Sequence, residues 1–246
     1  RWEDVAQVSV VGDIAAQTAI PSEYDYARQY FAGLSVPVQL ILGNHDYEYE
    51  DELSDKGKLQ HASAEIQQQK LEAFQQTFSL PSLYYAKQAG RYRLLYLSPD
   101  AICGHSTEIS EEQLQWLAGE LETHKEEPTL IFFHAPLKGT LLPYNKIIDT
   151  PSFIAQPVEK LDQLLKLHPQ IRLWVSGHTH TPATNESFAA TDINTYAGTK
   201  VVDIHNSDLD RGMIWTNSLY LYENHIVVKT YNHKTDAWEE ALTRTF

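Results

Sequence analysis

The segment Ser176-Gly177-His178-Thr179-His180 places two histidines two residues apart, directly after the mostly apolar run Ile171-Arg172-Leu173-Trp174-Val175. The apolar run predicts a buried strand, and Gly177 lets the backbone turn where that strand ends. Once the backbone leaves the extended conformation, both imidazoles can point at one place, and imidazole is the commonest metal ligand in proteins. A His-x-His pair by itself is weak evidence, because solvated loop histidines are common, so the rest of the chain decides its meaning.

Three other predicted strands are followed, within two residues, by a side chain of a type that binds metals. The strands Val8–Val11, Val38–Leu42 and Thr129–Phe133 lead into Asp13, into Asn44 and His45, and into His134. In open α/β sheets, ligands bind at the carboxyl ends of strands, so residues far apart in the sequence can meet there. Each of them has a structural alternative, as a turn residue or a buried histidine. Together, at equivalent strand ends, they predict a metal centre.

Composition and charge limit the classes of protein to which the chain can belong. Of its 246 residues, 42% are hydrophobic and 21% are charged, as in globular proteins, and short apolar strands alternate with amphipathic helices. The net charge of −14 argues against a nucleic-acid polymer as partner, because non-specific binding needs a basic surface. The single cysteine, Cys103, excludes a disulfide framework, and we expect it to be buried. No apolar run reaches the length of a membrane span.

The second half of the chain is expected to cover the site and to close the fold. Segment 137–156 has no clear period and contains Pro143 and Pro151, which predicts a long loop over the site. After it, short strands are predicted at Lys200–Ile204, Met213–Thr216, Leu219–Tyr222 and Ile226–Tyr231. The aromatic-rich tail, Tyr220–Trp238, is expected to be a sheet edge and its cover, with a contact in a homodimer as the alternative.

The order of these motifs resembles that of the calcineurin-like metallophosphoesterases. That family has Asp-x-His, Gly-Asp, Gly-Asn-His-Asp/Glu, a lone histidine after a strand, and Gly-His-x-His. This chain has Gly12-Asp13, Gly43-Asn44-His45-Asp46, His134 and Gly177-His178-Thr179-His180. The resemblance implies an α/β (α+β) fold, in which a two-sheet β-sandwich is flanked by helices. It also implies two metal ions at the strand ends, of Mn, Fe or Zn.

The resemblance also implies a role for each matching residue. Asp13 would bridge the two metal ions, and His180 would belong to one of them. Asn44, His134 and His178 would complete the site of the other ion. His45 is similar to the histidine that lies near the scissile phosphate without binding metal, and Asp46 would orient its ring. A hydroxide between the ions would attack phosphorus in line, while His45 donates to the phosphoryl oxygen or protonates the leaving oxygen.

One motif of the family, the Asp-x-His that holds the other metal, is absent from this sequence. Arg1–Val5 is interpreted as part of the helix that follows it. Residues 1–246 are therefore expected to form a single metallophosphoesterase domain without its first strand and part of its first helix. Either the sequence is a fragment or the protein has lost one metal half-site, and we expect the first. We assign no cellular location, although the cytoplasm is slightly favoured.

The expected substrate is a small phosphoester. Gly104, followed by Ser110–Leu117, is similar to the cyclic-nucleotide and glycerophosphodiester phosphodiesterase branch of the family. A phosphodiesterase is therefore expected. A phosphomonoesterase on the same metals and a non-catalytic binding module that keeps one ion are the alternatives. His105, Tyr144 and His205-Asn206 either line the substrate pocket or are ordinary loop and strand-end residues.

Overall fold

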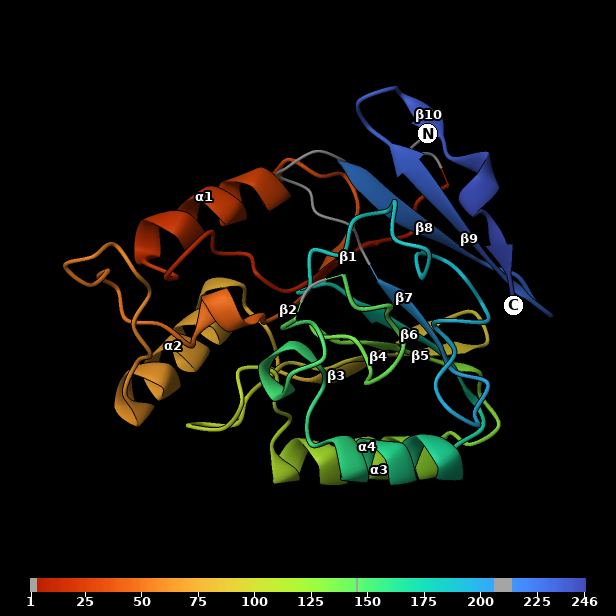
Figure 1. Cartoon of the computed structure of the whole chain (residues 1–246), viewed down its shortest axis with the longest axis horizontal. Helices are drawn as coiled ribbons and strands as arrows, with labels where there is room; N and C mark the ends of the chain where they lie inside the picture. Colours follow the sequence, from red (N-terminus) through yellow and green to blue (C-terminus); the bar gives the residue numbers. More distant parts are fainter. Residues whose placement is uncertain (1–3, 145, 206–213) are drawn as a thin grey trace.

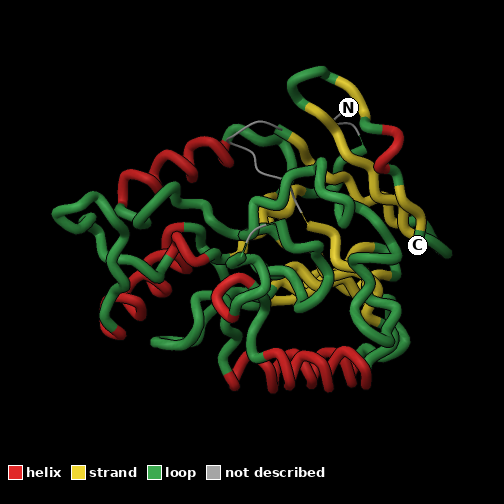
Figure 2. The backbone as a smooth tube through the Cα atoms, viewed as in Figure 1, coloured by secondary structure: helices red, strands yellow, loops and turns green. Residues whose placement is uncertain are grey.

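The computed structural model describes residues 4–144, 146–205 and 214–246 (Figures 1 and 2). Its helices are α1 (Pro21–Ala32), α2 (Ala64–Thr77), α3 (Glu111–Thr123) and α4 (Val158–Leu167), with 3₁₀ turns η1 (Asn44–Asp46), η2 (Pro151–Phe153) and η3 (Glu240–Leu242). Its strands are β1 (Val8–Val11), β2 (Val38–Ile41), β3 (Tyr85–Ala89), β4 (Tyr92–Tyr96), β5 (Thr129–Phe132), β6 (Ile171–Ser176), β7 (Val202–His205), β8 (Trp215–Leu221), β9 (Ile226–Asn232), β10 (Ala237–Trp238) and β11 (Arg244–Thr245).

The strands form three sheets. A five-stranded sheet has the order β3-β4-β5-β6-β7, in which β3 is antiparallel to β4 and the other neighbours are parallel. β1 and β2 form a parallel pair, and β8, β10 and β11 pair antiparallel with β9. Because parallel strands end at one edge of a sheet, β5 and β6 deliver the residues that follow them to the same place.

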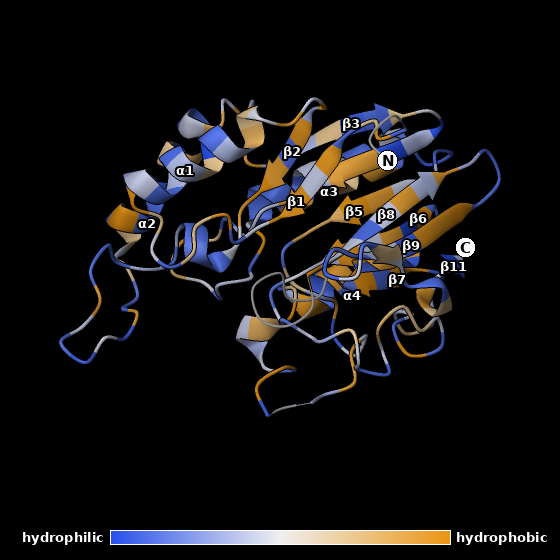
Figure 3. Cartoon of the chain, turned by 90° about the horizontal axis from the view of Figure 1, so that it is seen from above, coloured by the Kyte–Doolittle hydropathy of each residue, from blue (hydrophilic) through white to orange (hydrophobic). Residues whose placement is uncertain are grey.

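The five-stranded sheet separates two hydrophobic layers. On one face, leucines of α3 and α4 pack against buried residues such as Ile131 and Trp174, and both helices lie under the sheet in Figure 1. On the other face, Leu130 and Leu173 share a buried cluster with Val11 of β1, Ile41 of β2 and Val228 of β9. Strands β1, β2 and β5 are coloured mostly as hydrophobic in Figure 3, as burial in the core requires. The predicted sandwich of sheets flanked by helices is confirmed.

Helices α1 and α2 cover the remaining side of β1 and β2. Tyr24 of α1 and Phe74 of α2 are buried against Leu40 and Leu42, with the two aromatic rings edge to face at 5.8 Å. The four helices are amphipathic, as expected, and each turns its buried residues toward the core. Ser110 caps the start of α3, since its side chain accepts a hydrogen bond from the backbone N–H of Gln113.

Two predictions of secondary structure differ from the structure. Asp4 lies in a turn and Val5 is irregular, so the predicted N-terminal helix is absent from the described residues. The two strands predicted at 213–216 and 219–222 are one strand, β8, since Asn217 and Ser218 pair with β9 and the Asn217 side chain accepts a hydrogen bond from Thr230. Met213 and Asn206 lie outside the described residues.

Cys103 is exposed rather than buried, because it lies in a turn with φ +57°. The tail after Tyr220 runs through β9, which pairs with β8, β10 and β11 and so lies at the centre of its sheet, and only the two-residue strand β10 lies at an edge. Among the described helices, none is long and apolar enough to cross a membrane.

Candidate metal centre

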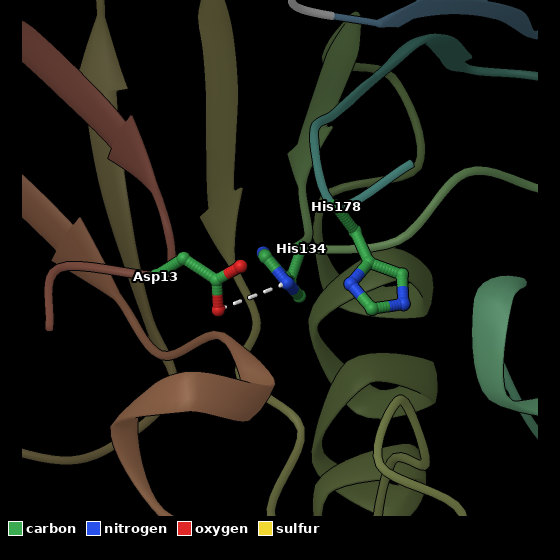
Figure 4. Close-up of side chains that lie close together, drawn as sticks. All are labelled: Asp13, His134 and His178. Carbon is green, nitrogen blue, oxygen red and sulfur yellow. Dashed lines mark ion pairs between the residues drawn. The ribbon is translucent and has the colours of Figure 1, made fainter. Parts of the chain in front are cut away.

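The predicted site residues lie at the carboxyl ends of four strands. Asp13 follows β1, η1 follows β2, His134 follows β5, and His178 follows β6. One potential ligand atom from each of Asp13, His134 and His178 lies within 4.8 Å of the others. Figure 4 shows the three side chains close together. Asn44 joins them, since its Oδ1 lies 3.1 Å from the Nε2 of His134. The chain therefore brings together four residues that the sequence singled out.

His134 presents a defined nitrogen to this group. The ring is fully buried, and its Nδ1 donates a hydrogen bond to the carbonyl of Val11 at 2.7 Å. Nε2 then faces two oxygen acceptors, the Oδ1 of Asp13 at 3.3 Å and the Oδ1 of Asn44. A lone pair facing two oxygens is unfavourable unless a proton or a metal cation lies among them. This donor set of carboxylate, amide oxygen and imidazole therefore fits a divalent transition metal.

Two glycines allow the two loops of the site to approach each other. A Cβ at Gly12, where φ is +93°, would lie 2.6 Å from the backbone nitrogen of Gly43 and from the Nδ1 of His134. A Cβ at Gly43 would lie 2.3 Å from the Oδ1 of Asp13. Both distances are shorter than real Cβ contacts, so a side chain at either glycine would push the carboxylate away from the imidazole.

The electrostatics of the group follow from its burial. Burial favours the neutral form of Asp13, but the charge and hydrogen bond of His134 outweigh it and hold the pKa of this carboxyl well below its usual range. Burial opposes protonation of His134, yet the Asp13 carboxylate raises the pKa of that ring. Burial and the neighbouring charge of His134 lower the pKa of His178 to about 3. His178 is therefore neutral at neutral pH, as a metal ligand must be.

Asn44 has a partner that the sequence did not reveal. Its Nδ2 donates a hydrogen bond to the hydroxyl of Tyr49 at 3.1 Å, which leaves Oδ1 directed at His134. The Tyr49 ring also lies 5.2 Å from the ring of His45. The position of Tyr49 in the sequence, five residues after Asn44, does not indicate this role. Only the folding of η1 and of the turn after it brings Tyr49 next to Asn44.

His45 lies beside the centre, and its ring is not held by Asp46. The backbone N–H of His45 donates to the Oδ1 of Asp13 at 3.0 Å, and its Nδ1 donates to the carbonyl of Gln17 at 2.9 Å. Nε2 is thus the nitrogen left for a substrate. The sequence prediction that Asp46 orients this ring is wrong, because the carbonyl of Gln17 occupies Nδ1.

The Asp46 carboxylate instead joins the two loops that carry Asp13 and Asn44. It is fully buried and accepts hydrogen bonds from the backbone N–H groups of Gly43, Ile14 and Ala15, at 2.8, 3.2 and 2.8 Å. Asp46 is therefore a positioning residue for both loops rather than a partner of the histidine ring.

His180 is exposed, and among the described residues it is not part of the group formed by Asp13, His134 and His178. Both histidines of the pair have a left-handed backbone, with φ +63° at His178 and +47° at His180. The place of His180 in a second metal site stays a prediction.

Asp203 of β7 anchors the start of the predicted long loop, and the sequence analysis did not single it out. Its buried carboxylate accepts hydrogen bonds from the Ser176 hydroxyl at 2.7 Å, from the Leu137 N–H at 2.8 Å and from the Thr140 hydroxyl at 2.8 Å. The sequence feature that could have indicated this role is a carboxylate inside the otherwise apolar run Val201–Ile204, because a buried charge needs hydrogen-bond partners.

Asp203 should make stability depend on pH. Burial raises its pKa to about 7 from 3.8, despite its three hydrogen bonds, so the folded state binds the proton more tightly than the unfolded state. This contribution is greatest at low pH and is lost as pH rises through about 7. Between pH 3.8 and about 7, we expect the free energy of unfolding of the wild type to fall relative to that of Asp203→Asn. The fall should be up to about 1.4 kcal/mol per pH unit.

Urea denaturation across this pH range checks the prediction, with Asp25→Asn on the exposed face of α1 as the control. The amide can still accept from Leu137 and donate to Ser176, so the variant should fold. If the difference in unfolding free energy between the wild type and Asp203→Asn does not change with pH, the raised pKa of Asp203 is contradicted.

Comparisons with known proteins are consistent with this centre. The sequence profile of one family, described as Calcineurin-like phosphoesterase, matches residues 3–182, which include every predicted site residue. A dimetal phosphatase from Danio rerio is similar in structure, with a TM-score of 0.64 and 17% identity, over 99% of this chain and 85% of that one. A purple acid phosphatase from yellow lupin (Lupinus luteus) seeds has a TM-score of 0.66 and 14% identity, over 99% of this chain and 46% of that one. No curated protein sequence matches. At these identities the two structures show the fold alone.

Proposed function

Since this chain belongs to the calcineurin-like phosphoesterase family, we propose that it hydrolyses a small phosphodiester with two metal ions bound at the strand ends. The observation that carries the proposal is the convergence of Asp13, Asn44 and His134 with His178, in which the Nε2 of His134 faces two oxygens. The identity of the metals and the place of His180 beside the second ion belong to the proposal.

The bound ions would supply positive charge against the phosphoryl oxygens of the substrate. The ligands that the chain supplies determine the net charge of an ion together with its ligands. Asp13 contributes one negative charge, while Asn44 and the two neutral imidazoles contribute none. A divalent ion on these ligands keeps about one positive charge, which attracts an anionic ester despite the net charge of −14 on the whole chain.

His45 is proposed to move the proton of the leaving group. Gln17 holds the Nδ1–H of the ring, so Nε2 can donate a proton to the leaving oxygen and later recover it. The backbone N–H of His45 also holds Asp13, which keeps the ring next to the centre. Asp46 acts on the loops and not on this proton.

Hydrolysis assays on the metal-free protein, reconstituted separately with Mn²⁺, Zn²⁺ and Fe²⁺, test the proposal. We expect bis(p-nitrophenyl) phosphate to be hydrolysed faster than p-nitrophenyl phosphate, and a chelator to abolish both activities. Faster hydrolysis of p-nitrophenyl phosphate would mean that the protein is a phosphomonoesterase rather than a phosphodiesterase. Elemental analysis should find about two ions per chain. One bound ion without hydrolysis would favour a binding module, and no bound ion would overturn the proposal.

His45→Gln should lower kcat by roughly 10²-fold and leave metal affinity unchanged, because a general acid is lost while every proposed ligand stays. His225→Gln, in the turn between β8 and β9, is the matched control. Steady-state kinetics and a metal titration measure the two quantities. Loss of metal binding in His45→Gln would mean that this ring is a ligand.

A further inference from the structure

The segment between β5 and α4, described over residues 137–144 and 146–156 and here called the strap, contacts the His178 loop at three points. The Nε2 of His178 donates a hydrogen bond to the carbonyl of Ser152 at 2.8 Å. The ring of Phe153 lies against the ring of His178, with centroids 5.0 Å apart and planes at 31°. The hydroxyl of Tyr144 donates to the carbonyl of Thr179 at 2.5 Å.

The contact with Ser152 determines which nitrogen of His178 carries the proton. A carbonyl oxygen can only accept, so Nε2 must be the protonated nitrogen and Nδ1 must carry the lone pair. Figure 4 shows one nitrogen of this ring turned toward His134 and the other turned away. The nitrogen turned toward the group is therefore the one that can bind a metal, and the strap holds the other.

The turn that carries Ser152 and Phe153 is itself held in place. The buried hydroxyl of Thr107 donates to the carbonyl of Ile154 at 2.7 Å and to that of Pro151 at 3.2 Å, on either side of the turn. The backbone N–H of Gln156 donates to the carbonyl of Thr107 at 3.1 Å. The start of the strap is fixed separately by Asp203. The turn is thus built into the fold and does not depend on solvent for its hydrogen bonds.

We propose that the strap is a positioning element for the metal centre, in which the Ser152 carbonyl sets the tautomer of His178 and the Phe153 ring sets its orientation. The inference rests on the proposed function, because it concerns how a proposed ligand is prepared for the ion. Partners of this kind typically change metal affinity by 10- to 100-fold when they are removed. The strap thereby acts on His178 before any substrate binds.

Two variants test the proposal. Phe153→Ala removes the ring packed on His178, and Thr107→Val removes the hydroxyl that holds the turn without touching the histidine. Leu142→Ala is the control, since its exposed side chain lies on the same strap and its only described contact with the loop after His180 is through its backbone carbonyl, which accepts from Asn185. Thermal unfolding of each metal-free variant shows whether it is folded.

The readouts are Zn²⁺ affinity, by competition with a chromophoric chelator, and the ring ¹⁵N shifts of His178 in the metal-free protein. In the wild type we expect the Nε2–H tautomer. In both variants we expect a mixture of tautomers and an affinity about 10-fold weaker, whereas Leu142→Ala should match the wild type. A wild-type protein that binds no Zn²⁺ overturns the proposed function. A wild type that binds Zn²⁺ but shows the Nδ1–H tautomer, or folded variants that bind it equally well, overturns the positioning role.

Discussion

Asp13→Asn should lower the rate of phosphoester hydrolysis by roughly 10³-fold. The substitution keeps the shape of the side chain and an oxygen that can accept the His45 N–H, but it removes the negative charge that faces His134. Metal ions supply several kcal/mol of charge stabilisation to the transition state, and about 4 kcal/mol corresponds to this factor. The loss should appear together with weaker metal binding, because the carboxylate is the only charged group in the proposed ligand set.

Initial rates at saturating metal, combined with a metal titration, measure both effects. Asp25→Asn on α1 is the matched control, since it makes the same change in charge at an exposed position and should retain full activity. Full activity in Asp13→Asn would show that the carboxylate does not hold the ion and would overturn the proposed centre.

Asp46→Ala should cost about 4 kcal/mol of unfolding free energy even in the metal-free protein. The change leaves the N–H groups of Gly43 and Ala15, which are buried, and of Ile14, which is partly buried, without their acceptor, and each buried group costs about 1–3 kcal/mol. Asp46→Asn should cost roughly half as much, because one amide oxygen can still accept from two of the three donors. Both variants should lose activity, since the same loops carry Asp13 and Asn44.

Guanidinium denaturation provides the measurement. Burial, together with the Asp13 charge, raises the pKa of Asp46 to about 7, so stability depends on its ionisation and the three proteins are compared at one fixed pH. The order of stability should be wild type, then Asp46→Asn, then Asp46→Ala. Equal stability of all three would mean that water replaces the carboxylate, and the assignment of Asp46 as the link between the loops would then be wrong.

These predictions concern residues that the sequence named, but the structure changed the reason for one of them. Asp46 was expected next to the His45 ring because the resemblance to the family implied that contact. In a 3₁₀ turn, adjacent side chains point in different directions, so the carboxylate turns inward to the N–H groups of two loops while the ring turns to Gln17. The role that the resemblance implied for Asp46 therefore differs from the contacts that it makes.

The sequence by itself determined the alternation of strands and helices, the four strand ends, and the residue types placed there. Local patterns carry that information, because apolar periodicity and the ends of strands depend on nearest neighbours in the chain. These features were sufficient to predict the fold class and the group formed by Asp13, Asn44, His134 and His178.

Only the tertiary structure decided which atoms of those residues face one another. The carbonyls of Val11 and Ser152 select opposite nitrogens of His134 and His178, and a backbone carbonyl leaves no mark in the sequence. Tyr49 reaches Asn44, and Asp203 reaches Leu137, across 5 and 66 positions. Hydrogen bonds depend on distance and direction in space, and these are set when the sheets and loops pack together.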